Sequence, residues 1–176
     1  MTEIIPKFAP ESLLEHLGEL EISFELFHHV PVFTVAEADK VSAEIPGLHT
    51  RNLFLKDKKG NMVLVTLGHE TPIDLKKLSN LLNMGRFSFG SPERLWENLG
   101  VRPGSVTPLA ILNNIQRNIR MILEAQMMDF ERINVHPLDN SMTVSLAPQD
   151  LMTILEKHAI TPQIIDLGPA APDKEE

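Results

Sequence analysis

The chain has 176 residues, of which 43% are hydrophobic and 23% are charged, and it contains no cysteine. This length is typical of one domain, and these proportions favour a folded globular protein over a disordered one. The missing cysteine excludes disulfides, thiolate metal ligands and a cysteine nucleophile. No apolar run approaches the roughly 20 residues that cross a bilayer, and residues 1–10 lack the apolar segment of a signal peptide. We expect one cytoplasmic domain over residues 1–168 and a disordered tail over 169–176.

The formal net charge of −8 is unevenly distributed along the chain. Residues 51–120 hold eleven Lys or Arg and five Asp or Glu, a net charge of +6. The rest holds five basic and nineteen acidic residues, a net charge of −14. A basic segment in an acidic chain can form a local patch for a polyanion. Folding can equally scatter these charges over the surface, and the sequence alone leaves both interpretations open.

The first quarter of the chain predicts a helix, a strand and a second helix. The helix over residues 10–19 has Pro10 near its start and leucines along one face. Residues 22–27 alternate between apolar and polar types, as a half-buried strand does. Thr34, with Glu37 three residues later, forms a capping-box pattern that opens a helix ending before Pro46.

A β-hairpin is predicted next, with strands over residues 51–56 and 62–67 and a turn that contains Gly60 and Asn61. The second strand is almost wholly apolar, so we expect both of its faces to be covered.

The remaining elements interleave helices and strands. Helices are predicted over 73–82 and 91–99, the second ending at Gly100, and a Gly/Pro-rich loop follows at 100–108. The pattern then predicts strands over 118–124 and 141–146, a helix over 147–158 and a last strand over 163–167. This order indicates an α/β (α+β) fold, with a mixed β-sheet flanked by helices.

The loop over residues 100–108 is a candidate functional segment. Pro103 and Pro108 stiffen its ends, and Gly104 permits a close approach of the backbone or a positive φ. A rigid loop with backbone N–H groups can hold a carbonyl or a developing oxyanion. The same residues can also serve turn geometry alone.

Two further polar segments are candidates. Arg51 and Asn52 start the hairpin strand, and alternation places their side chains on opposite faces. They can reach into a cleft or end in solvent. His136 opens a polar turn that ends at Asn140, and its ring can line a pocket or lie on the surface. The seven histidines show no metal-ligand spacing, so we expect no metal and no other cofactor, although distant residues can still combine into a metal site.

Five segments of the chain follow one another in an order typical of one protein family. They are PVFTVAEAD (31–39), PGLHTRNLFLKDKKGN (46–61), IDLKKLSNLL (73–82), RFSFGSPERLWENLGVRPGSVTPLAILN (86–113) and HPLDN (136–140). Together they resemble the YbaK/ProRS-associated (prolyl-tRNA editing) domain family, and within it the free-standing alanyl-tRNA(Pro) deacylases. The resemblance covers roughly residues 20–167. The hairpin segment and the Gly-x-x-x-Pro loop are its most specific parts.

The resemblance implies a compact mixed β-sheet flanked by helices. It implies hydrolysis of the ester that joins a wrong amino acid, here alanine, to tRNA(Pro), without a metal or a covalent intermediate. The terminal 2′-hydroxyl of the tRNA assists in this family. The loop that places backbone donors near the aminoacyl group is carried over onto Gly104, Ser105, Val106, Thr107 and Pro108.

The resemblance also assigns residues outside the loop. Asn52 and His136 match the family's substrate-binding asparagine and histidine. Arg51 stands where the family usually has lysine in its catalytic set. Because arginine stays protonated, we expect Arg51 to be a substrate-orienting cation and not a general base.

The expected partners are mischarged tRNA(Pro) and, transiently, prolyl-tRNA synthetase, with the protein a monomer or a weak homodimer and with no membrane contact. Two alternatives stay open: a sibling specificity for Cys-tRNA(Pro) or Ser-charged tRNA, and a non-catalytic tRNA-binding module.

Overall fold

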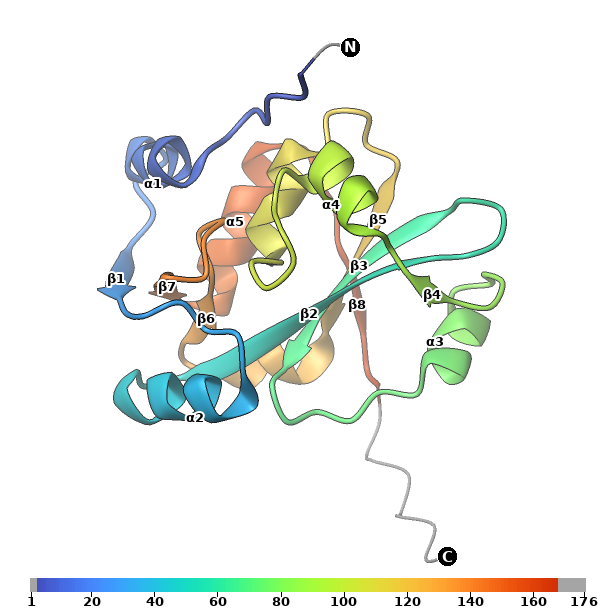
Figure 1. Ribbon diagram of the computed structural model, residues 1–176. Helices are drawn as coiled ribbons and strands as arrows, with labels where there is room; N and C mark the ends of the chain where they lie inside the picture. The colour runs from blue at the N-terminus through green and yellow to red at the C-terminus, as the bar shows by residue number, and fades with distance from the viewer. Residues whose placement is uncertain (1–2, 168–176) are drawn as a thin grey trace, which may run out of the picture.

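The computed structural model describes residues 3–167 and shows a mixed β-sheet with helices on both of its faces (Figure 1). The predicted tail at 169–176 lies outside the described residues. The helices are α1 (Pro10–Glu19), α2 (Val35–Glu44), α3 (Leu75–Leu81), α4 (Pro92–Leu99) and α5 (Pro148–Lys157), with 3-10 helices η1 (Pro108–Asn113) and η2 (Ala125–Asp129). The strands are β1 (Phe24–His28), β2 (Leu48–Lys56), β3 (Met62–Gly68), β4 (Ser88–Phe89), β5 (Ile119–Glu124), β6 (Ile133–Val135), β7 (Met142–Leu146) and β8 (Gln163–Ile165).

The sheet confirms the mixed α/β class. Its strands run in the order β1-β7-β6-β2-β3-β5-β8, and β4 pairs with β2 outside this path. β2 is antiparallel to β3 and parallel to β6, while β3, β5 and β8 run parallel to one another. β1, β7 and β6 form antiparallel pairs. None of the helices within residues 3–167 has the length and apolar character needed to cross a membrane.

Two apolar clusters hold the helices on the sheet. On one face, α1, α4, η1 and α5 pack around a large cluster that takes Leu64 from β3. On the other face, Leu78 of α3 packs in a smaller cluster with Val63, Val65 and Leu67 of the same strand. All seven residues of β3 are buried, which confirms the expectation that both faces of this strand are covered.

Single residues fix where several helices begin and end. The Thr34 hydroxyl accepts the N–H of Glu37 at 3.1 Å and so caps α2 at the predicted position. Ser91 caps α4 in the same way, and Gly100 ends it in the left-handed conformation with a φ of 64°. α3 begins at residue 75, later than the predicted 73, because the Asp74 carboxylate caps the helix by accepting two backbone N–H groups.

The sequence pattern misses β4, β6 and the two 3-10 helices, and it starts β2 too late. Leu48 and His49 belong to β2 because they pair in parallel with β6. β6 has three residues and joins a strand more than 80 positions away, so its formation depends on tertiary pairing and leaves little local signal. This pairing brings His136, which directly follows β6, to the first half of β2.

Candidate functional site

Asn52 and His136 line one small cavity. The cavity has a volume of about 60 Å³ and lies between β2, β6, β7 and α2. Thr50, His69 and Asn134 supply further polar wall atoms. The structure therefore brings together the two residues that the sequence predicts to bind substrate.

Asn52 connects this cavity to the Gly-x-x-x-Pro loop. Its Nδ2 donates to the carbonyl oxygen of Val106 at 3.0 Å, and its Oδ1 accepts the Thr66 hydroxyl at 2.6 Å. Thr66 is fully buried in β3, so the amide of Asn52 is held from both ends. The loop is thereby fixed to the sheet at the cavity wall.

The loop begins with a tight turn. The N–H of Ser105 donates to the carbonyl oxygen of Arg102 at 3.0 Å, and Pro103 and Gly104 occupy the two central positions. Gly104 has a φ of 90°, which a type II turn requires at its third residue and which favours glycine there. Turn geometry therefore accounts for Pro103 and Gly104, and the Ser105 amide is used within the turn.

Residues 104–108 do not line the cavity, and three of their amides are unpaired among the described residues. Within residues 3–167, the N–H groups of Gly104, Val106 and Thr107 have no hydrogen-bond partner. Pro108 has no N–H and opens η1. A cluster of unpaired backbone N–H groups on a fixed loop can stabilise the negative charge of a developing oxyanion.

His136 is held as a neutral ring with one free acceptor. Its Nδ1 lies 2.8 Å from the carbonyl oxygen of Met142. Because a carbonyl only accepts, Nδ1 carries the proton and Nε2 carries the lone pair. Burial lowers the pKa of His136 below its usual value, although the bond to Met142 opposes this shift. His136 therefore offers an unprotonated nitrogen at neutral pH.

The turn that follows His136 packs against the loop. Asn140 is buried, and its Nδ2 donates to the carbonyl oxygen of Val32 at 3.2 Å. The same nitrogen lies 3.5 Å from where a Cβ would stand on Gly104. Hydrogen bonds from the side chain and the backbone N–H of Ser141 lower the pKa of Asp139, so this turn is braced by a carboxylate at neutral pH.

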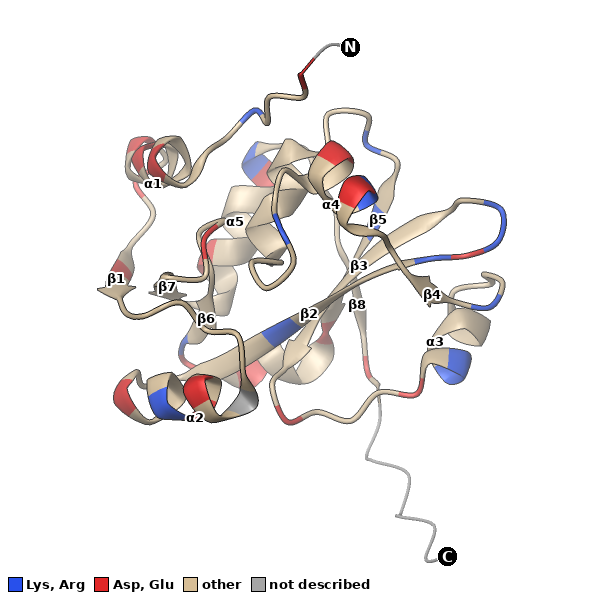
Figure 2. Ribbon diagram, viewed as in Figure 1, with Lys and Arg blue, Asp and Glu red and all other residues tan. Residues whose placement is uncertain are grey.

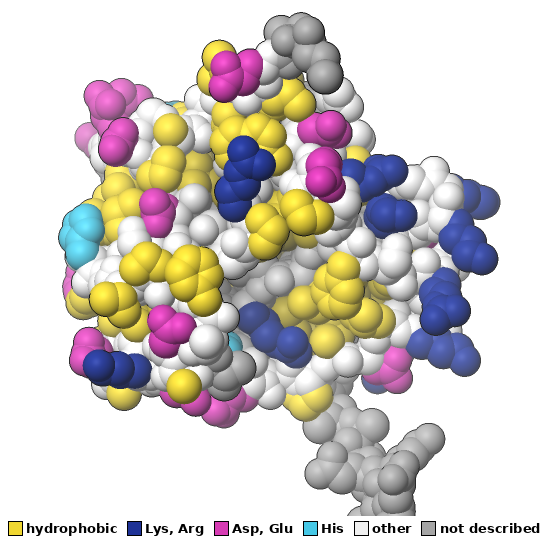
Figure 3. Space-filling view, viewed as in Figure 1, with side chains coloured by type: hydrophobic (Ala, Val, Ile, Leu, Met, Phe, Trp, Pro, Cys, Tyr) yellow, Lys and Arg dark blue, Asp and Glu magenta, His cyan; other side chains and the backbone are white. Residues whose placement is uncertain are grey.

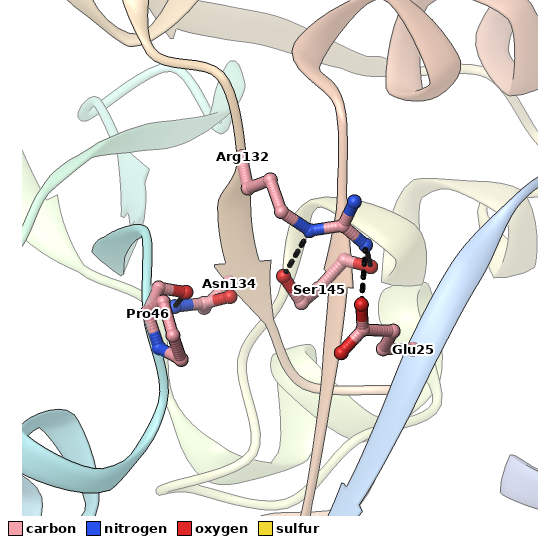
Figure 4. Close-up of polar contacts among 5 residues, drawn as sticks. All are labelled: Glu25, Pro46, Arg132, Asn134 and Ser145. Carbon is pink, nitrogen blue, oxygen red and sulfur yellow. Dashed lines mark hydrogen bonds and ion pairs between the residues drawn. The ribbon is translucent and has the colours of Figure 1, made fainter.

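Asn134 is a polar residue of the cavity that the sequence analysis misses. It is only 3% exposed, and its Nδ2 donates to the carbonyl oxygen of Pro46 at 3.1 Å, whereas its Oδ1 has no partner within residues 3–167 (Figure 4). Nearby, Arg132 donates to Ser145 and lies 3.8 Å from the Glu25 carboxylate, which ties β6, β7 and β1 together. The buried oxygen of Asn134 is thus held in place as an unused acceptor. A polar residue within an apolar strand, two positions before His136, is the signal that could have identified it.

Arg51 lies beside this cavity and does not line it. Its strand partner is Leu67, whereas that of Asn52 is Thr66, so the two side chains lie on opposite faces, as alternation predicts. Its Nη2 donates to the carbonyl oxygen of Thr71 at 2.6 Å, and its buried Nε has no partner within residues 3–167. The guanidinium is therefore anchored at one end with donors remaining.

Among the described residues, no group of three or more His, Asp or Glu side chains could hold a metal ion. Independence of activity from metal ions stays a prediction, which chelation tests.

Comparison with known proteins shows which family the chain belongs to. Residues 29–154 match the family model of the aminoacyl-tRNA editing domain. The chain is 33% identical over 160 residues to the "Prolyl-tRNA editing protein ProX" of Acetoanaerobium sticklandii, covering 90% of this chain and 98% of that protein. It is 35% identical over 164 residues to the "Prolyl-tRNA synthetase associated domain-containing protein 1" of Danio rerio, covering 92% and 89%.

The fold has a similar counterpart among solved structures. A structure described as a candidate trans-editing enzyme for prolyl tRNA synthetase aligns with a TM-score of 0.70 at 17% identity, covering 96% of this chain and all of that one. This likeness concerns the fold. From the family match and the two sequence relatives, the chain belongs to the aminoacyl-tRNA editing domain family and is an aminoacyl-tRNA hydrolase.

Proposed function

We propose that the protein is a trans-editing deacylase that hydrolyses mischarged Ala-tRNA(Pro) and spares Pro-tRNA(Pro). One relative is named for prolyl-tRNA editing and another for association with prolyl-tRNA synthetase, and both names support tRNA(Pro) as the carrier. The observation that carries the choice of alanine is the small cavity lined by Asn52 and His136. Because the activity is exerted in trans, we expect a cytoplasmic monomer or weak homodimer that contacts prolyl-tRNA synthetase only transiently.

The size of the cavity favours a small side chain. Its volume of about 60 Å³ is roughly the share of two water molecules in the liquid, whereas a cavity that admits benzene measures about 150 Å³. The methyl group of alanine fits such a space, and the five-membered ring of proline exceeds it. A synthetase pocket shaped for proline rejects alanine poorly, because missing methylenes are worth only ~1–3 kcal/mol. A second, smaller site corrects the resulting errors.

The groups around the cavity suit ester hydrolysis. Attack of water on the ester carbonyl creates an oxyanion, which the free N–H groups of Gly104, Val106 and Thr107 can stabilise. The Nε2 lone pair of His136 can accept a hydrogen bond from the attacking water or the terminal 2′-hydroxyl. The free Oδ1 of Asn134 can accept a hydrogen bond from the α-ammonium group of the substrate. Water adds directly to the ester carbonyl, the bond from that carbon to the ribose oxygen breaks, and the ribose oxygen takes up the proton that the water loses, so the amino acid is released without a covalent enzyme intermediate.

A sibling specificity is the second candidate, because serine and cysteine side chains exceed that of alanine by a single heavy atom. The deciding experiment incubates the pure protein with Ala-, Ser-, Cys- and Pro-charged tRNA and measures the release of free amino acid. We expect alanine to be released fastest and proline to stay bound. If serine or cysteine is released faster, the alanine assignment is wrong, and if every ester persists as in buffer, deacylation itself is refuted.

A further inference from the structure

We infer that one basic edge of the sheet is the docking surface for the phosphate backbone of the tRNA acceptor stem. This inference rests on the proposed function and adds where the nucleic acid lies. The basic edge is defined by six cations: Lys56, Lys58 and Lys59 at the β2–β3 turn, Lys76 and Lys77 on α3, and Arg86.

These cations gather on one side of the molecule. Figure 2 shows Lys and Arg concentrated at the β2–β3 turn and at α3, and Figure 3 shows them lining the same side of the surface. The turn and the segment after α3 adjoin, because a Cβ on Gly85 would lie 3.7 Å from the Cβ of Asp57. Five of the six side chains are exposed, and within residues 3–167 none of the six forms an ion pair. Their charge is therefore available to a partner.

Two acids adjoin this edge: the exposed Asp74 accepts the backbone N–H groups of Lys76 and Lys77 at the start of α3, and Asp57 is directed away from the surface. Asp57 is 3% exposed, and its carboxylate accepts the backbone N–H groups of Lys59 and Asn61 and the side-chain amide of Asn61. The Asn61 side chain is the main cause that lowers the pKa of Asp57. The carboxylate holds the turn in shape, and the flanking lysines face outward.

An exposed aromatic ring lies near the basic edge, on the short strand β4 that pairs with the end of β2. Phe89 is 63% exposed and pairs with Leu55 on β2, so it stands three positions beyond Asn52 along that strand. Arg51 and Leu55 share a face by alternation, and Phe89 lies on that face opposite Leu55. Figure 3 shows a patch of apolar side chains between basic side chains on this face of the molecule. Aromatic rings next to cations are the usual platform for unpaired nucleotides.

The spacing fits the end of a tRNA. From Asn52 to Lys56, the last residue of β2, the strand advances four residues, which is roughly 13 Å at ~3.3 Å per residue. The aminoacyl group is attached to an unpaired 3′ end, and four stacked nucleotides span roughly 14 Å at ~3.4 Å each. With the ester at the cavity, the unpaired nucleotides would run along β2 toward β4, and the first paired phosphates would reach the lysines. The rest of the chain is acidic, so the basic edge also sets the orientation.

The test measures the binding of uncharged tRNA(Pro) at several salt concentrations, which needs no activity. The variants are Lys58→Gln with Lys59→Gln, Lys76→Gln with Lys77→Gln, and Phe89→Ala. A matched control removes two exposed cations elsewhere, Lys7→Gln with Lys157→Gln. Each lysine pair should weaken binding about tenfold and reduce the slope of log K against log salt by about two, roughly one per phosphate contact. The control should change neither quantity.

A second readout separates docking from chemistry. Hydrolysis of an alanyl ester of the trinucleotide CCA should be unchanged in both lysine-pair variants and slowed in Phe89→Ala, because the short substrate reaches the ring but not the lysines. Wild-type tRNA affinity in both lysine-pair variants would overturn the inference. Loss of affinity only for purified prolyl-tRNA synthetase would also overturn it and assign this edge to a protein partner. If the wild type binds tRNA through these lysines yet hydrolyses no ester, the proposed function fails and the docking surface stands.

Discussion

Replacing Asn52 by aspartate tests whether the Gly-x-x-x-Pro loop works only while β2 holds it. The aspartate keeps the shape of the side chain and still accepts the Thr66 hydroxyl. The oxygen that replaces Nδ2 then faces the carbonyl oxygen of Val106, which is 3.0 Å from Nδ2 in the native protein. Two acceptors repel each other at this distance, so the loop must shift together with its free N–H groups.

The cost to folding and the cost to catalysis should differ. Losing one hydrogen bond while a partner stays unpaired costs about 1–3 kcal/mol of the free energy of unfolding. Losing a preorganised oxyanion donor typically lowers the rate by about 10²–10³, or ~2.7–4 kcal/mol of transition-state stabilisation. Asn52→Asp should therefore lose two to three orders of magnitude in rate while the protein remains folded at 25 °C.

Thr66→Val is the matched control. It removes the other hydrogen bond of Asn52 and leaves the bond to the loop in place. We expect about 0.5–1.5 kcal/mol of destabilisation and a rate close to that of the wild type. The assay is the single-turnover rate on Ala-tRNA(Pro) with enzyme in excess, measured beside thermal unfolding. Equal rates for the two variants would refute the role assigned to the Asn52–Val106 bond.

The other predictions concern the loop, the cation, the metal and pH. Gly104→Val should cost about 1–2 kcal/mol of stability, because φ is 90° there, and should damage activity far more. Equal losses in thermal midpoint and rate would support a purely structural turn. Arg51→Lys should keep or raise the rate and Arg51→Ala should lose about 2–3 kcal/mol of transition-state stabilisation, so three similar single-turnover rates would remove Arg51 from the site. Activity should survive exhaustive chelation, and loss with rescue by zinc would contradict this. Because burial lowers the pKa of His136, the unfolded chain binds a proton below about pH 6.5 that the native protein does not bind, so stability should fall as pH drops through that value. The free energy of unfolding of His136→Asn, measured against pH, should lack this fall. A profile equal to that of the wild type would show that His136 is not its source.

Local sequence patterns predict a helix or strand of this fold well when that element is long or has a clear cap. The helix α4 begins at Ser91 and ends at Gly100 as the sequence indicates, because a cap and a left-handed glycine act within a few residues. The almost wholly apolar β3 is buried on both faces, as its run of apolar residues indicates. β4 and β6 could not be predicted, since they have two and three residues and depend on pairing with distant strands, β4 with β2 and β6 with β2 and β7.

The candidate site shows the same division. Asn52 and His136 could be assigned from the resemblance, and the structure brings them to one cavity. The Asn52–Val106 bond could not be foreseen, because it joins residues 54 positions apart. Asn134 could not be recognised as a site residue, since its free oxygen is visible only once Pro46 is seen to occupy its amide nitrogen. The site assignment of Arg51 and of the loop residues stays a prediction for the variants above.

The most direct test of the central claim compares deacylation of Ala-tRNA(Pro) and Pro-tRNA(Pro) by the same enzyme preparation under single-turnover conditions. A cavity of about 60 Å³ predicts rapid release of alanine and a proline ester that persists as long as it does in buffer. Equal rates for the two esters, or faster release of proline, would contradict the claim that this cavity selects the amino acid by size.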